Sequence, residues 1–267
     1  MNVAEAVRSR YPGTSVVTNL LGDRQKAVDI VANMRAQDPK IVVAIGLLAA
    51  QAARQQLNNK QVIFCQVLNY DDFSLITPWM TGVSAIPSLE KQFYYWKLLN
   101  PKLKRIAMFT SEHMARVVTE ALRIAHKHGL ELLHREVSAS RELIPAFAQL
   151  SKEVQGLWLA PDSSILSSQT INEVLIQAIK SEVQVLAFSP TLLKNGATLS
   201  AIADEEEIVA ALMMRIREIE TNGSFTQTSV TPLTKAKIKI NERMTDQLTR
   251  DMSSRIWIDN DGYLQAQ

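Results

Sequence analysis

Polar side chains follow three apolar runs in the second half of the chain, at the points where predicted strands end. Ser111 follows the run from Ile106 to Phe109, Asp162 and Ser163 follow the run from Leu157 to Ala160, and Ser189 follows the run from Val185 to Phe188. The carboxyl ends of parallel strands share one edge of a sheet, where ligands bind beside the first N–H groups of helices. These side chains therefore predict a binding site for a small polar molecule. The alternative is that they only cap the helices that follow.

The first half of the chain has equivalent positions. The run from Ile41 to Ile45 reads as a buried strand, Gly46 permits a tight turn, and a helix beginning at Leu47 follows at once. After the next strand, Gln61 to Gln66, come Asn69 and Tyr70. Gly46, Leu47, Asn69 and Tyr70 are thus candidate ligand residues. Tyr70, Phe73 and Trp79 are aromatic residues that could stack on a ligand or simply pack in the core.

Patterns typical of catalysis are missing from the sequence. There is no glycine-rich dinucleotide fingerprint, P-loop or Gly-x-Ser-x-Gly elbow, and the four histidines are scattered. Cys65, the single cysteine, lies in a strand-like run, where a buried inert thiol is expected. The Asp259–Gly262 stretch starts like a calcium loop, but the chain ends before the twelfth position, which needs a carboxylate. We therefore expect neither an enzyme nor a metal or cofactor site.

The elements that must position the candidate residues alternate between strand and helix. In the first half, helices are predicted over 2–10 and 23–37 and strands over 15–20, 41–45, 61–66 and 81–87. The second half repeats the alternation from residue 105 to residue 188. Further strands are predicted over 198–203, 229–240, 255–258 and 263–264. Further helices are predicted over 204–222 and 241–251. This order predicts an α/β fold with two Rossmann-like lobes and parallel sheets. We expect an N-terminal lobe of residues 1–86 plus 196–224 and a C-terminal lobe of 87–195 plus 225–267.

Composition excludes several other classes of protein. The 29 basic and 27 acidic residues give a net charge of +2, too balanced for a nucleic-acid footprint. Hydrophobic residues make up 46% of the chain, yet no apolar run approaches the ~18 residues of a spanning helix.

Several segments, in order and spacing, resemble a known family. They are Ile41 to Gly46 with Ala49 and Ala50, Thr81 to Ser84, Lys91 to Ile106, Gly156 to Ser163, and Gly196 to Asp204. Together they look like the substrate-binding proteins of ABC transporters, in the group that includes tryptophan and tyrosine binders.

This resemblance implies a type I periplasmic-binding-protein fold, in which two lobes joined by three crossovers close on a ligand. Family members deliver a small solute, in several cases an aromatic amino acid, to an ABC permease in the membrane. The positions that match the family's cleft are Gly46–Leu47, the region of Ser84, Asp162–Ser163, and the loop from Ser189 to Asn195. In this scheme hydroxyls and N–H groups bind a carboxylate, and an aspartate binds an ammonium group.

The sequence departs from the family in three places. Leu47 stands where a hydroxyl residue usually follows the glycine, and the usual Pro-Gly-Gly-Asn run appears as the stretch from Thr77 to Met80. Members also carry an exported leader and a first strand before the helix at 2–10. We therefore expect the N-terminal lobe to lack its first strand in this sequence, and the full product to be exported to the periplasm or cell envelope.

The leading hypothesis is a monomeric solute-binding component of an importer. A ligand-sensing regulatory domain of the same fold is the alternative, and an attached DNA-reading or signalling domain would distinguish it. A cytoplasmic location is the alternative to export.

Overall fold

The computed structural model describes residues 2–20, 22–68, 70–241, 243, 256–260 and 263–266. They divide into two compact units. Unit 1 comprises residues 1–86 and 203–233, and unit 2 comprises residues 87–202 and 234–267. The chain thus passes between the units three times. These boundaries differ from the expected lobes at 196–202 and 225–233.

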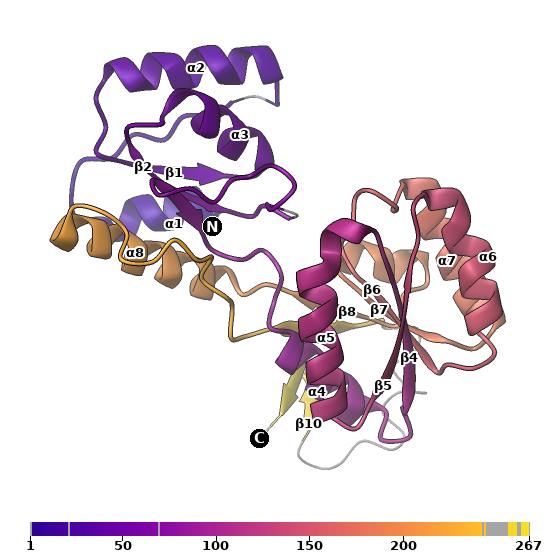
Figure 1. The fold of residues 1–267 in the computed structure, drawn as a ribbon. Coiled ribbons are helices and arrows are strands. Elements are labelled where there is room, and N and C mark those ends of the chain that lie inside the picture. Colours follow the sequence, from indigo (N-terminus) through magenta and orange to yellow (C-terminus); the bar gives the residue numbers. More distant parts are fainter. Residues whose placement is uncertain are drawn as a thin grey trace. The chain divides into compact units, whose positions relative to one another are not determined.

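Unit 1 is built on a short parallel sheet with strand order β1-β2-β3 (Figure 1). The strands are β1 (Ile41–Ile45), β2 (Gln61–Cys65) and β3 (Met80–Gly82). Helices α2 (Arg24–Ala36) and α3 (Leu47–Gln56) cover one face, and α1 (Val3–Arg10) and α8 (Glu205–Asn222) cover the other.

One edge of the unit 1 sheet is open among the described residues. β1 pairs with β2 in parallel register, and no described strand lies on its other side. Ile41, Val42 and Val43 are consequently only half-buried, although apolar residues on both faces are typical of a fully covered parallel strand. This arrangement agrees with a lobe that lacks its first strand.

The strand predicted over residues 15–20 is wrong. The segment pairs with no described strand, and Val16 and Val17 are 73% and 50% exposed. A β-branched run becomes a strand only when a neighbour takes up its backbone hydrogen bonds. The neighbour expected here is the first strand.

Unit 2 contains a six-stranded sheet with strand order β5-β4-β6-β7-β8-β9. Only β9, at the edge, runs antiparallel to its neighbour, β8. The strands are β4 (Arg105–Thr110), β5 (Glu131–Glu136), β6 (Gly156–Leu159), β7 (Gln184–Ala187), β8 (Leu199–Ile202) and β9 (Lys237–Ile240). β8 belongs to this sheet because it pairs with β7, which explains why residues 196–202 lie in unit 2.

Four helices cover the two faces of the unit 2 sheet (Figure 1). Helices α4 (Leu89–Leu99) and α5 (Ala115–Lys127) pack on one face, and α6 (Ser140–Leu150) and α7 (Ser168–Lys180) pack on the other. Two 3₁₀ turns, η1 (Glu112–Met114) and η2 (Pro190–Asn195), and an antiparallel pair, β10 (Ile256–Ile258) and β11 (Leu264–Ala266), complete the described elements.

Two further predictions need comment. The strand predicted over 229–240 is confirmed only at β9, and the segment before it contributes a single bridge, at Thr231. The helix predicted over 241–251 lies almost wholly outside the described residues.

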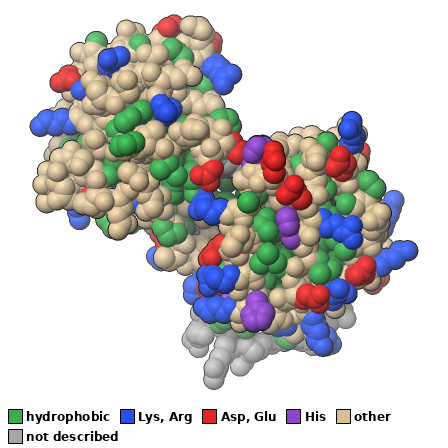
Figure 2. Space-filling view, viewed as in Figure 1, with side chains coloured by type: hydrophobic (Ala, Val, Ile, Leu, Met, Phe, Trp, Pro, Cys, Tyr) green, Lys and Arg blue, Asp and Glu red, His purple; other side chains and the backbone are tan. Residues whose placement is uncertain are grey.

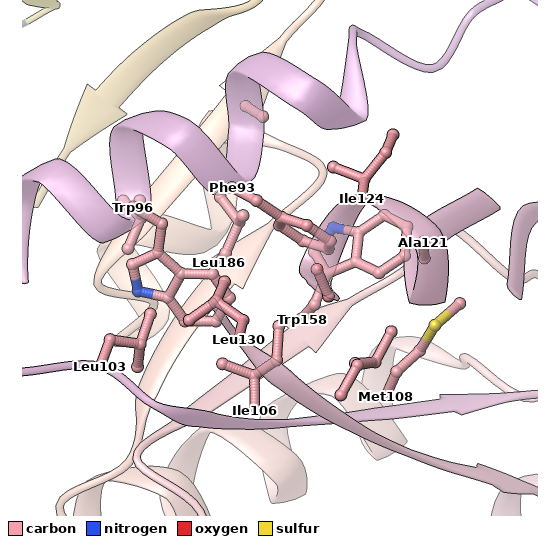
Figure 3. Packing of buried hydrophobic residues seen from close by; sticks show 14 of the residues in the cluster. Phe93, Trp96, Leu103, Ile106, Met108, Ala121, Ile124, Leu130, Trp158 and Leu186 are labelled. Carbon is pink, nitrogen blue, oxygen red and sulfur yellow. The ribbon is translucent and has the colours of Figure 1, made fainter. Parts of the chain in front are cut away.

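The core of unit 2 centres on two tryptophans (Figure 3). Trp158 of β6 meets Phe93 of α4 edge to face, with ring centroids 5.5 Å apart. The Trp96 indole N–H donates to the Gln184 side chain at 3.0 Å, and the Trp158 indole N–H donates to Gln92 at 3.1 Å. Each buried N–H therefore has an acceptor, which fixes the orientation of both rings.

This packing explains why residue 156 is glycine. A methyl group on Gly156 would lie 2.5 Å from the ring of Trp96 and 3.0 Å from Ile106. We expect Gly156→Ala to lower the free energy of unfolding by about 1–3 kcal/mol, because the fully buried Trp96 cannot move aside. Urea denaturation measures this loss.

Gly13→Ala is the matched control, since its new methyl group meets only the half-exposed Tyr11 ring. We expect a change within about 0.5 kcal/mol there. Equal effects of the two substitutions would contradict this account of the core.

Candidate functional site

Asp162 joins the carboxyl ends of two neighbouring strands in unit 2. It follows β6 and is 1% exposed. One carboxylate oxygen accepts the backbone N–H of Ser111, after β4, at 2.7 Å, and the other accepts the N–H of Ser164 at 3.0 Å. Since a buried carboxylate is stable only when its oxygens are hydrogen-bonded, these bonds fix both loops. The structure therefore brings together two residues that the sequence predicted separately.

The Ser111 hydroxyl is the unusual group at this edge. Ser111 is 6% exposed, and its Oγ atom is buried without a hydrogen-bond partner among the described residues. An unsatisfied buried hydroxyl costs about 1–3 kcal/mol, so such groups require an explanation. A ligand atom that hydrogen-bonds to Oγ would remove that cost.

The other predicted residues of unit 2 have local partners or lie in solvent. The Ser189 hydroxyl caps η2, accepting from Thr191 N–H at 3.4 Å and lying 2.8 Å from the Thr191 hydroxyl. The exposed Asn195 side chain donates to Asn172 at 2.9 Å. Ser163 is exposed beside Asp162. For Ser189, the structure matches the capping alternative.

In unit 1, the polar groups at the Gly46 turn after β1 are the backbone N–H groups at the start of α3 rather than side chains. Gly46 has φ of +85°, a conformation that favours glycine, and it precedes α3 with no side-chain cap on the helix. Leu47, the first residue of α3, is 36% exposed. The N–H groups of the first turn of α3 have no intrahelical acceptors, so this end of the helix favours an anionic group.

The aromatic candidates of unit 1 pack mainly against protein. Tyr70 is 7% exposed, and its ring centroid lies 5.6 Å from that of Phe64 in the core. Trp79 is half-buried, with the Arg54 guanidinium 5.4 Å from its ring centroid. Asn69 lies outside the described residues.

Ser84 lies in the segment that leads from β3 to α4. Its hydroxyl accepts the N–H of Ile86 at 3.1 Å and donates to the carbonyl of Ile86 at 3.2 Å. Both bonds are local, so Ser84 shapes its own loop.

Ser200 is a second buried hydroxyl, at a position that the sequence analysis did not single out as a candidate. It lies in β8 opposite Ala187, is fully buried, and has no hydrogen-bond partner within the part of the chain that the structure describes. The available signal was a serine within the apolar run from Leu199 to Ile202.

The histidines and the cysteine of the described residues lie in structural settings. Burial lowers the pKa of His134, and its Nε2 atom lies 2.8 Å from the Thr110 hydroxyl. His128 ends α5 and bonds Glu90 of α4 at 2.7 Å. Burial raises the pKa of the Cys65 thiol to about 12, which agrees with an inert thiol. The described residues contain no group of three or more His, Cys, Asp or Glu side chains that could hold a metal ion.

The surface carries charges of both signs. On the face shown in Figure 2, basic and acidic side chains are interspersed over unit 2 and form no field of one sign. None of the described helices is both long and apolar enough to cross a bilayer.

Two relatives with known ligands or structures are similar to this chain. A tyrosine-binding protein of Clostridioides difficile is 24% identical over 260 residues, which cover 93% of this chain and 73% of the relative. The ABC domain in complex with L-Trp from Streptococcus pneumoniae has a TM-score of 0.64 at 19% identity, covering 94% of this chain and 89% of that one.

A third similar protein shares the same architecture. The ligand-free, open structure of a substrate-binding protein with adhesive properties from Clostridium difficile has a TM-score of 0.69 at 18% identity, covering 97% of this chain and 90% of that one. These likenesses show a type I periplasmic-binding-protein fold. The sequence model of the ABC transporter substrate binding protein family matches residues 14–258. The chain therefore belongs to the family of ABC transporter substrate-binding proteins.

Proposed function

We propose that this protein is the solute-binding component of an ABC importer and that it closes on a small molecule between two lobes. The observation that carries the proposal is the buried Ser111 hydroxyl, which has no partner and is held at the strand ends by Asp162. Family membership supports a permease as the partner and the cell envelope as the location.

An amino acid is the solute class that these groups fit. Its carboxylate suits the uncapped N-terminus of α3 after Gly46, where N–H groups and the helix dipole favour an anion. The Ser111 hydroxyl can donate to or accept from a polar group of the solute. The tyrosine-binding relative supports an aromatic side chain.

Asp162 has a different role in this proposal from the one predicted. Its oxygens already accept two backbone N–H groups and the residue is 1% exposed, so we assign it to positioning Ser111 rather than to direct capture of an ammonium group. Gly46, Leu47 and Ser111 are then the proposed contact residues. Ser189 and Asn195 contribute to the shape of the neighbouring loop.

A screen of the twenty amino acids by thermal unfolding tests the solute class. At a solute concentration one hundred times Kd, binding stabilises the folded protein by about 2.7 kcal/mol. For a protein of this size that corresponds to a rise in Tm of roughly 5–10 °C. We expect the largest rise with an aromatic amino acid, and no rise with any amino acid would contradict the proposed class.

Two substitutions distinguish the proposed role of Ser111, which contacts the solute, from that of Asp162, which positions Ser111. Ser111→Ala removes a hydroxyl that has no partner in the free protein, so we expect unchanged or slightly higher stability without solute. We expect solute binding about 10- to 100-fold weaker, because a hydrogen bond to a charged group contributes about 1.5–3 kcal/mol. Calorimetric titration with the solute found in the screen measures the change.

Asp162→Ala should act on the free protein instead, since it leaves the buried N–H of Ser111 without its acceptor, at a cost of about 1–3 kcal/mol. The exposed Ser138, which follows β5 at the same edge of the sheet, provides the control Ser138→Ala, with little effect on stability or binding. Wild-type affinity in Ser111→Ala would refute the assignment of Ser111.

A further inference from the structure

Two of the three segments that connect the units pair with each other. Thr231 N–H donates to the carbonyl of Gly82 at 2.8 Å, and Ser84 N–H donates to the carbonyl of Thr231 at 2.9 Å. These bonds make Val83 and Thr231 a parallel bridge within unit 1. The first and third crossings therefore begin as a parallel ladder.

The same register returns in unit 2. Ser88 N–H donates to the carbonyl of Lys235 at 3.0 Å. In a parallel ladder, every second residue of one strand donates its N–H to the other strand. A ladder that contains the bond from Ser84 N–H to the Thr231 carbonyl therefore continues with a bond from Ile86 N–H to the Leu233 carbonyl. The bond after that one joins Ser88 N–H to the Lys235 carbonyl. The outer bonds of this ladder are present on both sides of the unit boundary.

The central bonds are missing, and Ser84 engages the backbone groups of Ile86. In this described stretch Leu233 N–H does not donate to the Ser84 carbonyl, and Ile86 N–H does not donate to the Leu233 carbonyl. Instead, the Ser84 hydroxyl accepts the N–H of Ile86 at 3.1 Å and donates to its carbonyl at 3.2 Å. One side chain thus engages both backbone groups that Ile86 would use in the ladder.

The interruption coincides with the boundary between the units. The first crossing passes from unit 1 to unit 2 after Ile86, and the third crossing passes after Leu233. Each of the two segments contains a proline, Pro87 or Pro232. At both positions the backbone nitrogen faces away from the partner strand, so the missing N–H of proline is not the cause of the gap.

The segment on the unit 1 side of the gap is firmly held. Arg215 of α8 is 6% exposed, and its guanidinium donates to the Thr231 hydroxyl at 2.9 Å and to the carbonyl of Ser229 at 2.8 Å. The Thr81 hydroxyl also donates to the carbonyl of Ser229, at 2.9 Å. Within these two segments, the residues left to bend are therefore those between Thr231 and Lys235 and those between Ser84 and Ser88.

We propose that Ser84 is a hinge residue. Its hydroxyl binds the backbone N–H and carbonyl of Ile86 and so prevents these groups from completing the ladder between the two crossing segments at the unit boundary. The element has two states: Ile86 bonded to Ser84, which leaves the crossing free to bend, and Ile86 bonded to Leu233, which makes the ladder continuous and stiff. This inference rests on the proposed two-lobe closure, and it replaces the predicted contact between Ser84 and the solute.

Measurements on the solute-free protein test the hinge, so the result does not depend on the proposed solute. Spin labels on Asn33→Cys in unit 1 and Lys180→Cys in unit 2, both exposed positions, report the distance between the units by electron double resonance. Cys65 is buried and will not take the label. We expect Ser84→Ala to narrow the distance distribution and to slow amide exchange at Ile86 about threefold to tenfold, the effect of one net hydrogen bond.

Two controls accompany this variant. Ser84→Thr keeps the hydroxyl and should retain the wild-type distribution and exchange rate. Ser9→Ala removes a comparable local bond, from the Ser9 hydroxyl to the Ala6 carbonyl at 3.0 Å, and should change neither measurement. The proposal is overturned if Ser84→Ala leaves the distribution as broad as in the wild type and Ile86 exchanges as fast or faster.

Discussion

The buried carboxylate of Asp162 is the interaction on which the proposed site depends. Removing a carboxylate from water is costly, and here two charge-assisted hydrogen bonds from backbone N–H groups offset that cost. Because one donor belongs to the loop after β4 and the other to the loop after β6, the same bonds align two strand ends. They also hold the Ser111 hydroxyl in a buried position without a partner. In the proposed function the same residues therefore affect both stability and binding, because a solute would supply the hydrogen bond that the Ser111 hydroxyl lacks among the described residues.

The two units offer different kinds of polarity at the ends of their strands. Unit 1 presents the N–H groups of α3 after Gly46, beside the apolar side chain of Leu47. Unit 2 presents a side-chain hydroxyl fixed by a carboxylate. The proposed solute, an aromatic amino acid, has an anionic end, a second polar group and an apolar portion. The proposed closure needs a crossing that bends, and the local bonds of Ser84 are the device proposed for it.

Much of the fold was predictable because buried parallel strands have a clear sequence pattern. The apolar runs at β1, β4 and β6, each followed by a helix, identified the α/β class together with the runs at β2 and β7, and they placed Ser111 and Asp162 at strand ends. The strand expected over 15–20 failed because pairing depends on a neighbour, which local sequence does not reveal. Ser189 and Ser84 proved to have local partners and Asn195 a partner in α7, since a cap, a loop and a ligand site use the same residue types. The unsatisfied hydroxyl of Ser200 became visible only from burial and bonding in the folded chain.

A crystal structure of the protein with its solute bound tests the central claim most directly. The account predicts that a polar atom of the solute lies about 2.6–3.2 Å from Ser111 Oγ, while both bonds of Asp162 to backbone N–H groups persist. It would be contradicted by a bound solute that leaves Ser111 Oγ without a partner, or that draws Asp162 away from Ser111 to bind the solute itself.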